Sequence, residues 1–129
     1  GGTPTGNLAR YMTGVAYLDQ KQPDQALSQF EEYDENGSMV SASHYSGIAA
    51  AHEQKGDFIA AAEAYVKASE IQPNDFTTPF FLQEAGRCYE QAGDKAKAKE
   101  IYEKIKEQYP NSQQGRSIEK YIARVNVAG

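Results

Sequence analysis

Apolar residues recur along this chain at spacings of three and four positions, the period of a helix that buries one face. The clearest case lies near the carboxyl end, where one stripe is formed by Ile118, Tyr121, Ile122 and Val125. No segment shows the strict apolar–polar alternation of a half-buried strand. The pattern therefore predicts an all-α fold.

Turn and cap residues divide the chain into seven predicted helices. Asn7, Asp57 and Thr78 are expected to cap the first, fourth and fifth helices, and Gly56 to end the third. The predicted helices span residues 7–20, 23–33, 41–55, 58–71, 79–93, 95–109 and 113–127. A turn is predicted at 34–38, and a lengthened link at 75–79.

Five residue columns recur three times, at separations of 35 and 37 positions. The columns are Gly14, Ala49 and Gly86; Tyr17, His52 and Tyr89; Ala26, Ala61 and Ala98; Phe30, Tyr65 and Tyr102; and Ser38, Pro73 and Pro110. Small residues at fixed positions allow two helices to approach closely, and the aromatic residues then fill the space between repeats. A hairpin that cannot bury its apolar face alone is stabilised by stacking on its neighbours. We therefore predict three stacked helical hairpins.

The columns resemble the tetratricopeptide repeat, which has a small residue, Tyr, Ala, an aromatic residue and Pro at a period of about 34. This resemblance implies a right-handed α-solenoid of three helix hairpins plus a C-terminal capping helix. The expected organisation is an N-terminal extension at 1–6 and one repeat domain at 7–129. Its repeats would cover about 7–40, 42–75 and 79–112, followed by the capping helix at about 113–127.

The bulk composition narrows the classes of function. With 40% hydrophobic and 24% charged residues, the 129-residue chain suits one folded domain. Its net charge of -5 disfavours a phosphate backbone as partner, so nucleic acid is not expected. No apolar run reaches the roughly 18 residues that a membrane-spanning helix needs, so direct membrane insertion is not expected either.

The residues that most often carry chemistry are few and scattered. Cys88 is the single cysteine, no base stands beside it in the sequence, and a buried, inert thiol is expected. His44 and His52 are eight residues apart, about 12 Å along a helix, too far for one ion to join. Paired carboxylates such as Glu31 and Glu32 suit a solvated helix face. We therefore expect no catalytic, metal or cofactor site and no enzyme.

In the family that the chain resembles, the first helix of each hairpin lines a concave groove. The candidate groove residues on these helices are Tyr11, Val15, Leu18, Ser46, Ala50, Glu53, Phe80, Gln83, Arg87 and Glu90. Tyr11 and Phe80 would be apolar anchors for an extended peptide or a helix, and Arg87 a charged handle. The alternative is that these positions face water or a helix upstream of the chain.

One subgroup of the family grips chaperone C-termini with a Lys/Asn/Asn/Lys/Arg clamp. The equivalent positions here are Tyr11, Val15, Gly47, Phe80 and Glu84, and all five depart from the clamp. A chaperone-tail adaptor is therefore not expected.

The stretches 2–9, 75–79 and 118–124 are similar to a bacterial group, common in Bacteroidetes, in which one membrane span precedes a short repeat domain. The layout of this group is similar to that of the ancillary Sec translocon subunit. The resemblance implies a membrane anchor upstream of Gly1 and a scaffold role at the cell envelope, in a periplasmic setting. We expect a protein-binding module in envelope protein assembly or trafficking, with a self-associating scaffold, a homo-oligomer, as the alternative.

Overall fold

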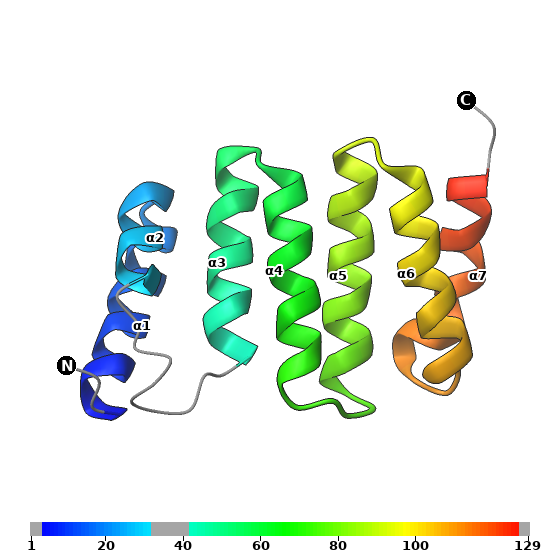
Figure 1. Cartoon of the computed structure of the whole chain (residues 1–129), viewed down its shortest axis with the longest axis horizontal. Helices are drawn as coiled ribbons and strands as arrows, with labels where there is room; N and C mark the ends of the chain where they lie inside the picture. The colour runs from blue at the N-terminus through cyan, green and yellow to red at the C-terminus, as the bar shows by residue number, and fades with distance from the viewer. Residues whose placement is uncertain (1–3, 32–41, 127–129) are drawn as a thin grey trace.

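A computed structural model of the chain describes residues 4–31 and 42–126. Within these two ranges every regular element is a helix, and the helices follow one another in chain order along the long axis (Figure 1). They are α1 (Pro4–Asp19), α2 (Pro23–Glu31), α3 (Ala42–Lys55), α4 (Phe58–Ile71), α5 (Thr77–Gln91), α6 (Lys95–Gln108) and α7 (Gln113–Asn126). The predicted all-α helical solenoid is confirmed.

The first helix begins earlier than predicted. α1 starts at Pro4, inside the segment expected to be an extension, and already includes Asn7. Proline suits the first turn of a helix because its missing N–H would have no partner there. The prediction that Asn7 caps this helix is therefore wrong. The predicted turn at 34–38 lies outside the described residues.

The start of α5 also differs from the prediction, because Asn74 and not Thr78 supplies the cap. The Asn74 Oδ1 atom accepts hydrogen bonds from the backbone N–H groups of Phe76 (2.9 Å) and Thr77 (2.7 Å). The Thr78 hydroxyl instead accepts a hydrogen bond from the Asn74 N–H at 2.8 Å. The helix therefore begins at Thr77, two residues before the predicted start at Pro79.

Other caps follow the sequence more closely. The Asp57 side chain accepts a hydrogen bond from the Ala60 N–H, and Asp94 does the same for Lys97 at 3.0 Å. Both carboxylates satisfy N–H groups that have no partner inside the helix. Gly56 and Gly93 precede these two caps with φ angles of +79° and +85°, which L side chains rarely adopt.

The recurring small and aromatic columns meet in the core as predicted. The Phe30 ring lies against Gly14 and Gly47, where an added Cβ would come within 2.5 Å and 2.7 Å of ring carbons. The Tyr102 ring lies against Gly86 in the same way, and both aromatic residues are fully buried. At Gly14, Gly47 and Gly86 the ring occupies the space that a side chain would need.

The buried residues form two clusters. The larger cluster extends from α3 to α7 and includes Tyr65, Leu82 and Tyr102. The smaller one holds Ala26, Phe30 and Ala51 and joins the first hairpin to α3. At the carboxyl end, α7 buries Ile118, Ile122 and Val125 and leaves Tyr121 half-buried, as expected of a capping helix.

Candidate binding face

The first helix of each hairpin and the capping helix are joined side by side by polar contacts. Gln54 Nε2 on α3 donates a hydrogen bond to the Leu18 carbonyl on α1 at 2.9 Å. Arg87 on α5 reaches Glu53 on α3, and Arg124 on α7 reaches Glu90 on α5. We call the surface formed by α1, α3, α5 and α7 the leading-helix face.

The predicted groove residues all keep part of their surface exposed. They are Tyr11, Val15, Leu18, Ser46, Ala50, Glu53, Phe80, Gln83, Arg87 and Glu90. Phe80 is the most accessible apolar member, at 46% exposure. On the same helices, Ala49, Leu82 and Ala85 are completely buried. The candidate residues therefore lie on the outer side of the leading helices.

The apolar members on α1 also support the core. Tyr11, Val15 and Leu18 pack against the small cluster around Phe30, and the Tyr11 and Phe30 ring centroids are 6.1 Å apart. Only part of each side chain thus remains for a partner. The α1 end of the face is therefore an apolar surface whose side chains are held in place by the small cluster.

Arg87 lies between two carboxylates and is not an isolated handle. Its Nη2 atom donates to Glu53 Oε1 at 2.9 Å and to Glu84 Oε2 at 2.8 Å. The hydrogen bond with Glu84 is the largest effect that raises the pKa of Arg87, so the guanidinium stays charged. The charge of Arg87, predicted to be a handle for a partner, is therefore already balanced within the chain.

Cys88 is attached to the same network. Its Sγ atom donates to Glu53 Oε1 at 2.9 Å, and the residue is fully buried. Burial, followed by the nearby Glu53 carboxylate, raises the pKa of the thiol. A nucleophilic cysteine needs a lowered pKa and access to solvent, so Cys88 fits the predicted inert thiol.

A second network repeats the first one along the chain, and sequence reasoning missed it. Arg124 Nε donates to Glu90 Oε1 at 2.8 Å, and the Tyr102 hydroxyl donates to Glu90 Oε2 at 2.6 Å. Glu90 stands 37 positions after Glu53, and Arg124 stands 37 positions after Arg87. Extending the repeat columns into the capping helix would have revealed this equivalence.

The histidines do not join these networks. His44 is buried, and its ring contacts Phe30 and Tyr45 edge-on, with centroids 6.2 Å and 5.2 Å apart. In the described part of the chain, no group of three histidine, cysteine or acidic residues is placed to hold a metal ion. Among the described helices, none has the length and apolar character needed to cross a bilayer.

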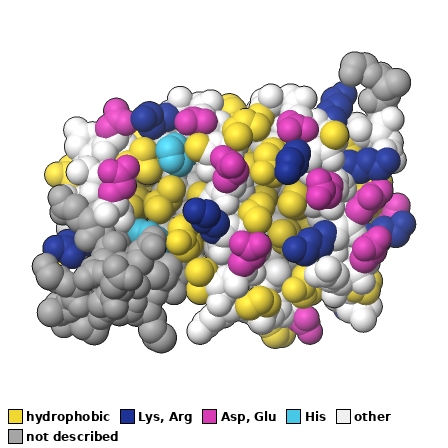
Figure 2. All heavy atoms as spheres, in the orientation of Figure 1, with side chains coloured by type: hydrophobic (Ala, Val, Ile, Leu, Met, Phe, Trp, Pro, Cys, Tyr) yellow, Lys and Arg dark blue, Asp and Glu magenta, His cyan; other side chains and the backbone are white. Residues whose placement is uncertain are grey.

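The outer surface mixes its charges. Figure 2 shows acidic and basic side chains interspersed with hydrophobic ones on one broad face of the molecule. On the leading-helix face the two arginines described above are each paired with a carboxylate. The charges of both arginines are thus balanced within the chain.

Comparison with known proteins agrees with the geometry. Two family models, both described as tetratricopeptide repeat, match the chain: one at residues 8–36 and 82–112, the other at residues 45–75. The matched segments follow the three hairpins α1–α2, α3–α4 and α5–α6. No curated protein matches the chain. Together the repeat matches cover most of the sequence, and the chain therefore belongs to the tetratricopeptide repeat family.

Proposed function

We propose that the chain is a non-catalytic adaptor whose leading-helix face binds an extended peptide or a helix of a partner protein. Tetratricopeptide repeats typically form scaffolds that bind proteins or peptides. The observation that carries the proposal is the partial exposure of all ten candidate residues on helices that are tied side by side. In this proposal the face is the concave groove of the solenoid.

The chemistry of the face suggests what the partner offers. Phe80 and Tyr11 would contact apolar side chains, and Ser46 and Gln83 supply polar groups between them. With Arg87 already paired, an acidic tail has no free cation at that position. The net charge of -5 likewise favours a protein partner over nucleic acid.

A matched pair of surface variants tests the groove. Phe80→Arg places a charge on the leading helix α5, and Ile59→Arg places the same charge on α4 at similar exposure, 46% against 42%. Tagged chains would be mixed with extract of the source organism, and the partners recovered would be compared by quantitative mass spectrometry. We expect Phe80→Arg to lose partners that both the parent and Ile59→Arg recover. Equal recovery by all three chains would rule out binding through this face.

Self-association is the second candidate, and one observation favours it. Leu8 and Met12 lie one turn apart on α1 and are 57% and 61% exposed. An apolar stripe of this kind can pack against a second copy. If it does, sedimentation should show a dimer that Met12→Lys disrupts, and a strict monomer at high concentration removes this candidate.

We also propose, on the sequence resemblance alone, that the protein works at the cell envelope in assembly or trafficking. The resemblance involves the segments 2–9, 75–79 and 118–124. Fractionation of the source cells, followed by detection with an antibody against this chain, tests the proposal. Recovery with the membrane fraction would support it, and recovery with the cytosol alone would overturn it.

A further inference from the structure

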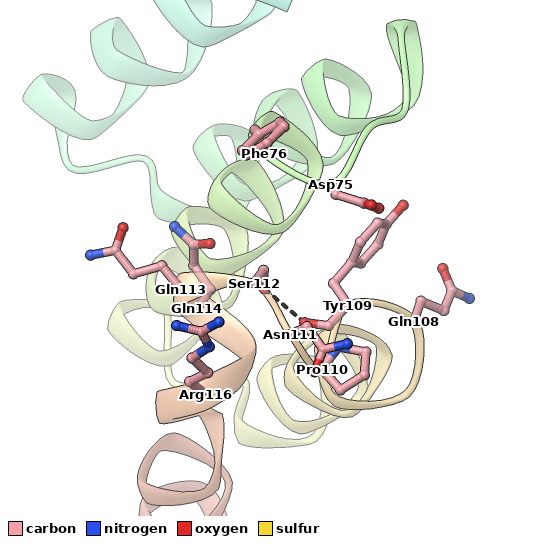
Figure 3. A pocket seen from close by; sticks show the side chains of 10 residues that line it. All are labelled: Asp75, Phe76, Gln108, Tyr109, Pro110, Asn111, Ser112, Gln113, Gln114 and Arg116. Carbon is pink, nitrogen blue, oxygen red and sulfur yellow. Dashed lines mark hydrogen bonds between the residues drawn. The ribbon is translucent and has the colours of Figure 1, made fainter.

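A pocket of about 540 Å³ lies where two inter-helix turns meet (Figure 3), and none of the ten candidate groove residues lines it. One wall is the α4–α5 turn, with Asp75 and Phe76. The other is the α6–α7 turn and the first turn of α7, with Gln113, Gln114 and Arg116. Ligand sites commonly measure about 300–1,000 Å³, so the pocket can hold a short peptide segment.

The α4–α5 wall is rigidly built yet presents an unburied aromatic side chain. Besides its two backbone caps, Asn74 donates from Nδ2 to the Gln72 carbonyl at 2.9 Å and to Thr77 Oγ1 at 2.7 Å. These bonds fix the turn on both sides of Phe76, which remains 85% exposed. A preorganised, exposed aromatic ring is the kind of residue that anchors binding sites.

The opposite wall is fixed as well. The Ser112 hydroxyl donates to the Tyr109 carbonyl at 2.7 Å and accepts from the Gly115 N–H at 2.9 Å. A Cβ at Gly115 would collide with that same Tyr109 carbonyl, so only glycine allows this close approach. The amide side chains beside it therefore project from a rigid base.

Three polar side chains of the pocket are uncommitted. In the part of the chain that the structure describes, the side chains of Gln113, Gln114 and Arg116 form no hydrogen bond or ion pair. Carboxamides both donate and accept, which matches the main chain of an extended peptide. Figure 3 shows Arg116 and Asp75, the two charged residues of the lining, on different sides of the pocket.

From these features we propose that the pocket is a second binding site, for a short segment of a partner protein. The segment carries an apolar side chain that packs on Phe76 and a carboxylate that pairs with Arg116. Asp75, on the wall of Phe76, repels an acidic group there and so sets the direction of the segment. The amides of Gln113 and Gln114 contact the main chain in between.

Defined peptides test the site by NMR. The probe is a blocked tetrapeptide, acetyl-Gly-Phe-Gly-Glu-amide, titrated into the isotope-labelled chain. We expect saturable shifts of the backbone amides of Phe76, Gln113 and Arg116, with a dissociation constant of about 1 mM or tighter. Shifts confined to Phe80 and Gln83, or no saturable shift below about 10 mM, would overturn the proposal.

Variants of exposed residues give the matched controls. Phe76→Ala should weaken binding about tenfold or more. Arg116→Gln should weaken binding of the Glu peptide about fivefold and leave unchanged the peptide in which Gln replaces Glu. Met12→Ala and Lys104→Gln remove an apolar group and a charge outside the pocket and should change neither affinity. Equal affinity of Phe76→Ala and the parent chain would contradict the site. This outcome does not depend on whether the candidate groove binds a partner.

Discussion

At the scale of the residue, two aromatic rings dictate what can stand opposite them. Phe30 lies against Gly14 and Gly47, and Tyr102 lies against Gly86. Sequence columns anticipated the pairing of small with aromatic residues. They did not show Gly47, because it falls outside the columns, and its contact depends on how α3 approaches the first hairpin.

The ring of Tyr102 should make Gly86→Ala destabilising. Alanine favours a helix over glycine by about 1 kcal/mol, so the free energy of unfolding would rise if the space were open. Here the added methyl group meets a fully buried ring, and overpacking costs about 1–3 kcal/mol. We expect a net loss of about 1 kcal/mol in urea unfolding. An unchanged or higher stability would show that the ring moves aside freely.

Glu90 should make stability depend on pH. Burial alone would raise its pKa, but hydrogen bonds from Arg124 and Tyr102 outweigh burial, and the net pKa is lowered. The ionised carboxylate therefore stabilises the fold above the ordinary carboxyl pKa, and this contribution is lost as the pH falls through the lowered value. We expect Glu90→Gln to lower the unfolding free energy by about 1 kcal/mol at pH 7.

Urea unfolding of both chains at neutral pH and near pH 3 measures the difference, which should shrink in acid. Glu103→Gln is the control, since Glu103 is half-exposed and 4.0 Å from Lys99. At neutral pH, Glu103→Gln should lower the free energy of unfolding by less than Glu90→Gln does. If the difference between the parent and Glu90→Gln stayed constant across the pH range, the pairing of Glu90 with Arg124 would be contradicted.

At the scale of the element, helix existence was predictable and some helix starts were not. The periodic apolar stripes and the Asp57 cap located α4 at its observed bounds. The predicted start of α5 was wrong because two residues near the turn, Asn74 and Thr78, both have side chains that suit a helix cap. Which one acts depends on the path of the turn, and Asn74 takes the role through bonds to Phe76 and Thr77.

Asn74→Ala should weaken the start of α5. The change removes the Oδ1 bonds to two N–H groups and the Nδ2 bonds to Gln72 and Thr77. Loss of a side-chain cap costs about 1–2 kcal/mol. The other lost hydrogen bonds add little, because water can replace them in this exposed turn. Thermal unfolding of the variant should begin at a lower temperature than that of the parent. Gln72→Ala, an exposed change in the same turn, should stay within about 0.5 kcal/mol, and equal effects of both would refute the cap.

The candidate face stays a prediction. The resemblance to the repeat family assigned the ten residues to leading helices, and all of them keep some exposure. Extending the columns would have matched Glu90 with Glu53 and Arg124 with Arg87, but the contact within each pair depends on the register between helices. The pocket beside Phe76 was equally hidden, since it requires two turns that are distant in sequence to meet.

At the scale of the whole molecule, the two core clusters imply unequal stability along the solenoid. The first hairpin contributes to the small cluster around Phe30, whereas α4 and α5 lie within the large one. Ile48 on α3 packs against both clusters and couples them. Repeat proteins open locally where interfaces between neighbours are weakest.

Native-state hydrogen exchange should follow this division. We expect amides in α1 and α2 to exchange about ten times faster than those in the centres of α4 and α5. Ile48→Ala should widen the difference, because it weakens the contact between the clusters. Uniform protection from α1 to α7 would mean that the solenoid opens only as one unit.

The paired carboxylates and arginines also bear on how long such a molecule can be. Glu53 and Arg87 are 34 positions apart, and so are Glu90 and Arg124. A duplicate of residues 53–89, inserted in front of Glu90, would bring its own glutamate and arginine at the same interval. Each new boundary between repeats would then have its own glutamate–arginine ion pair. Tandem duplication could therefore lengthen the solenoid and keep this contact at every boundary.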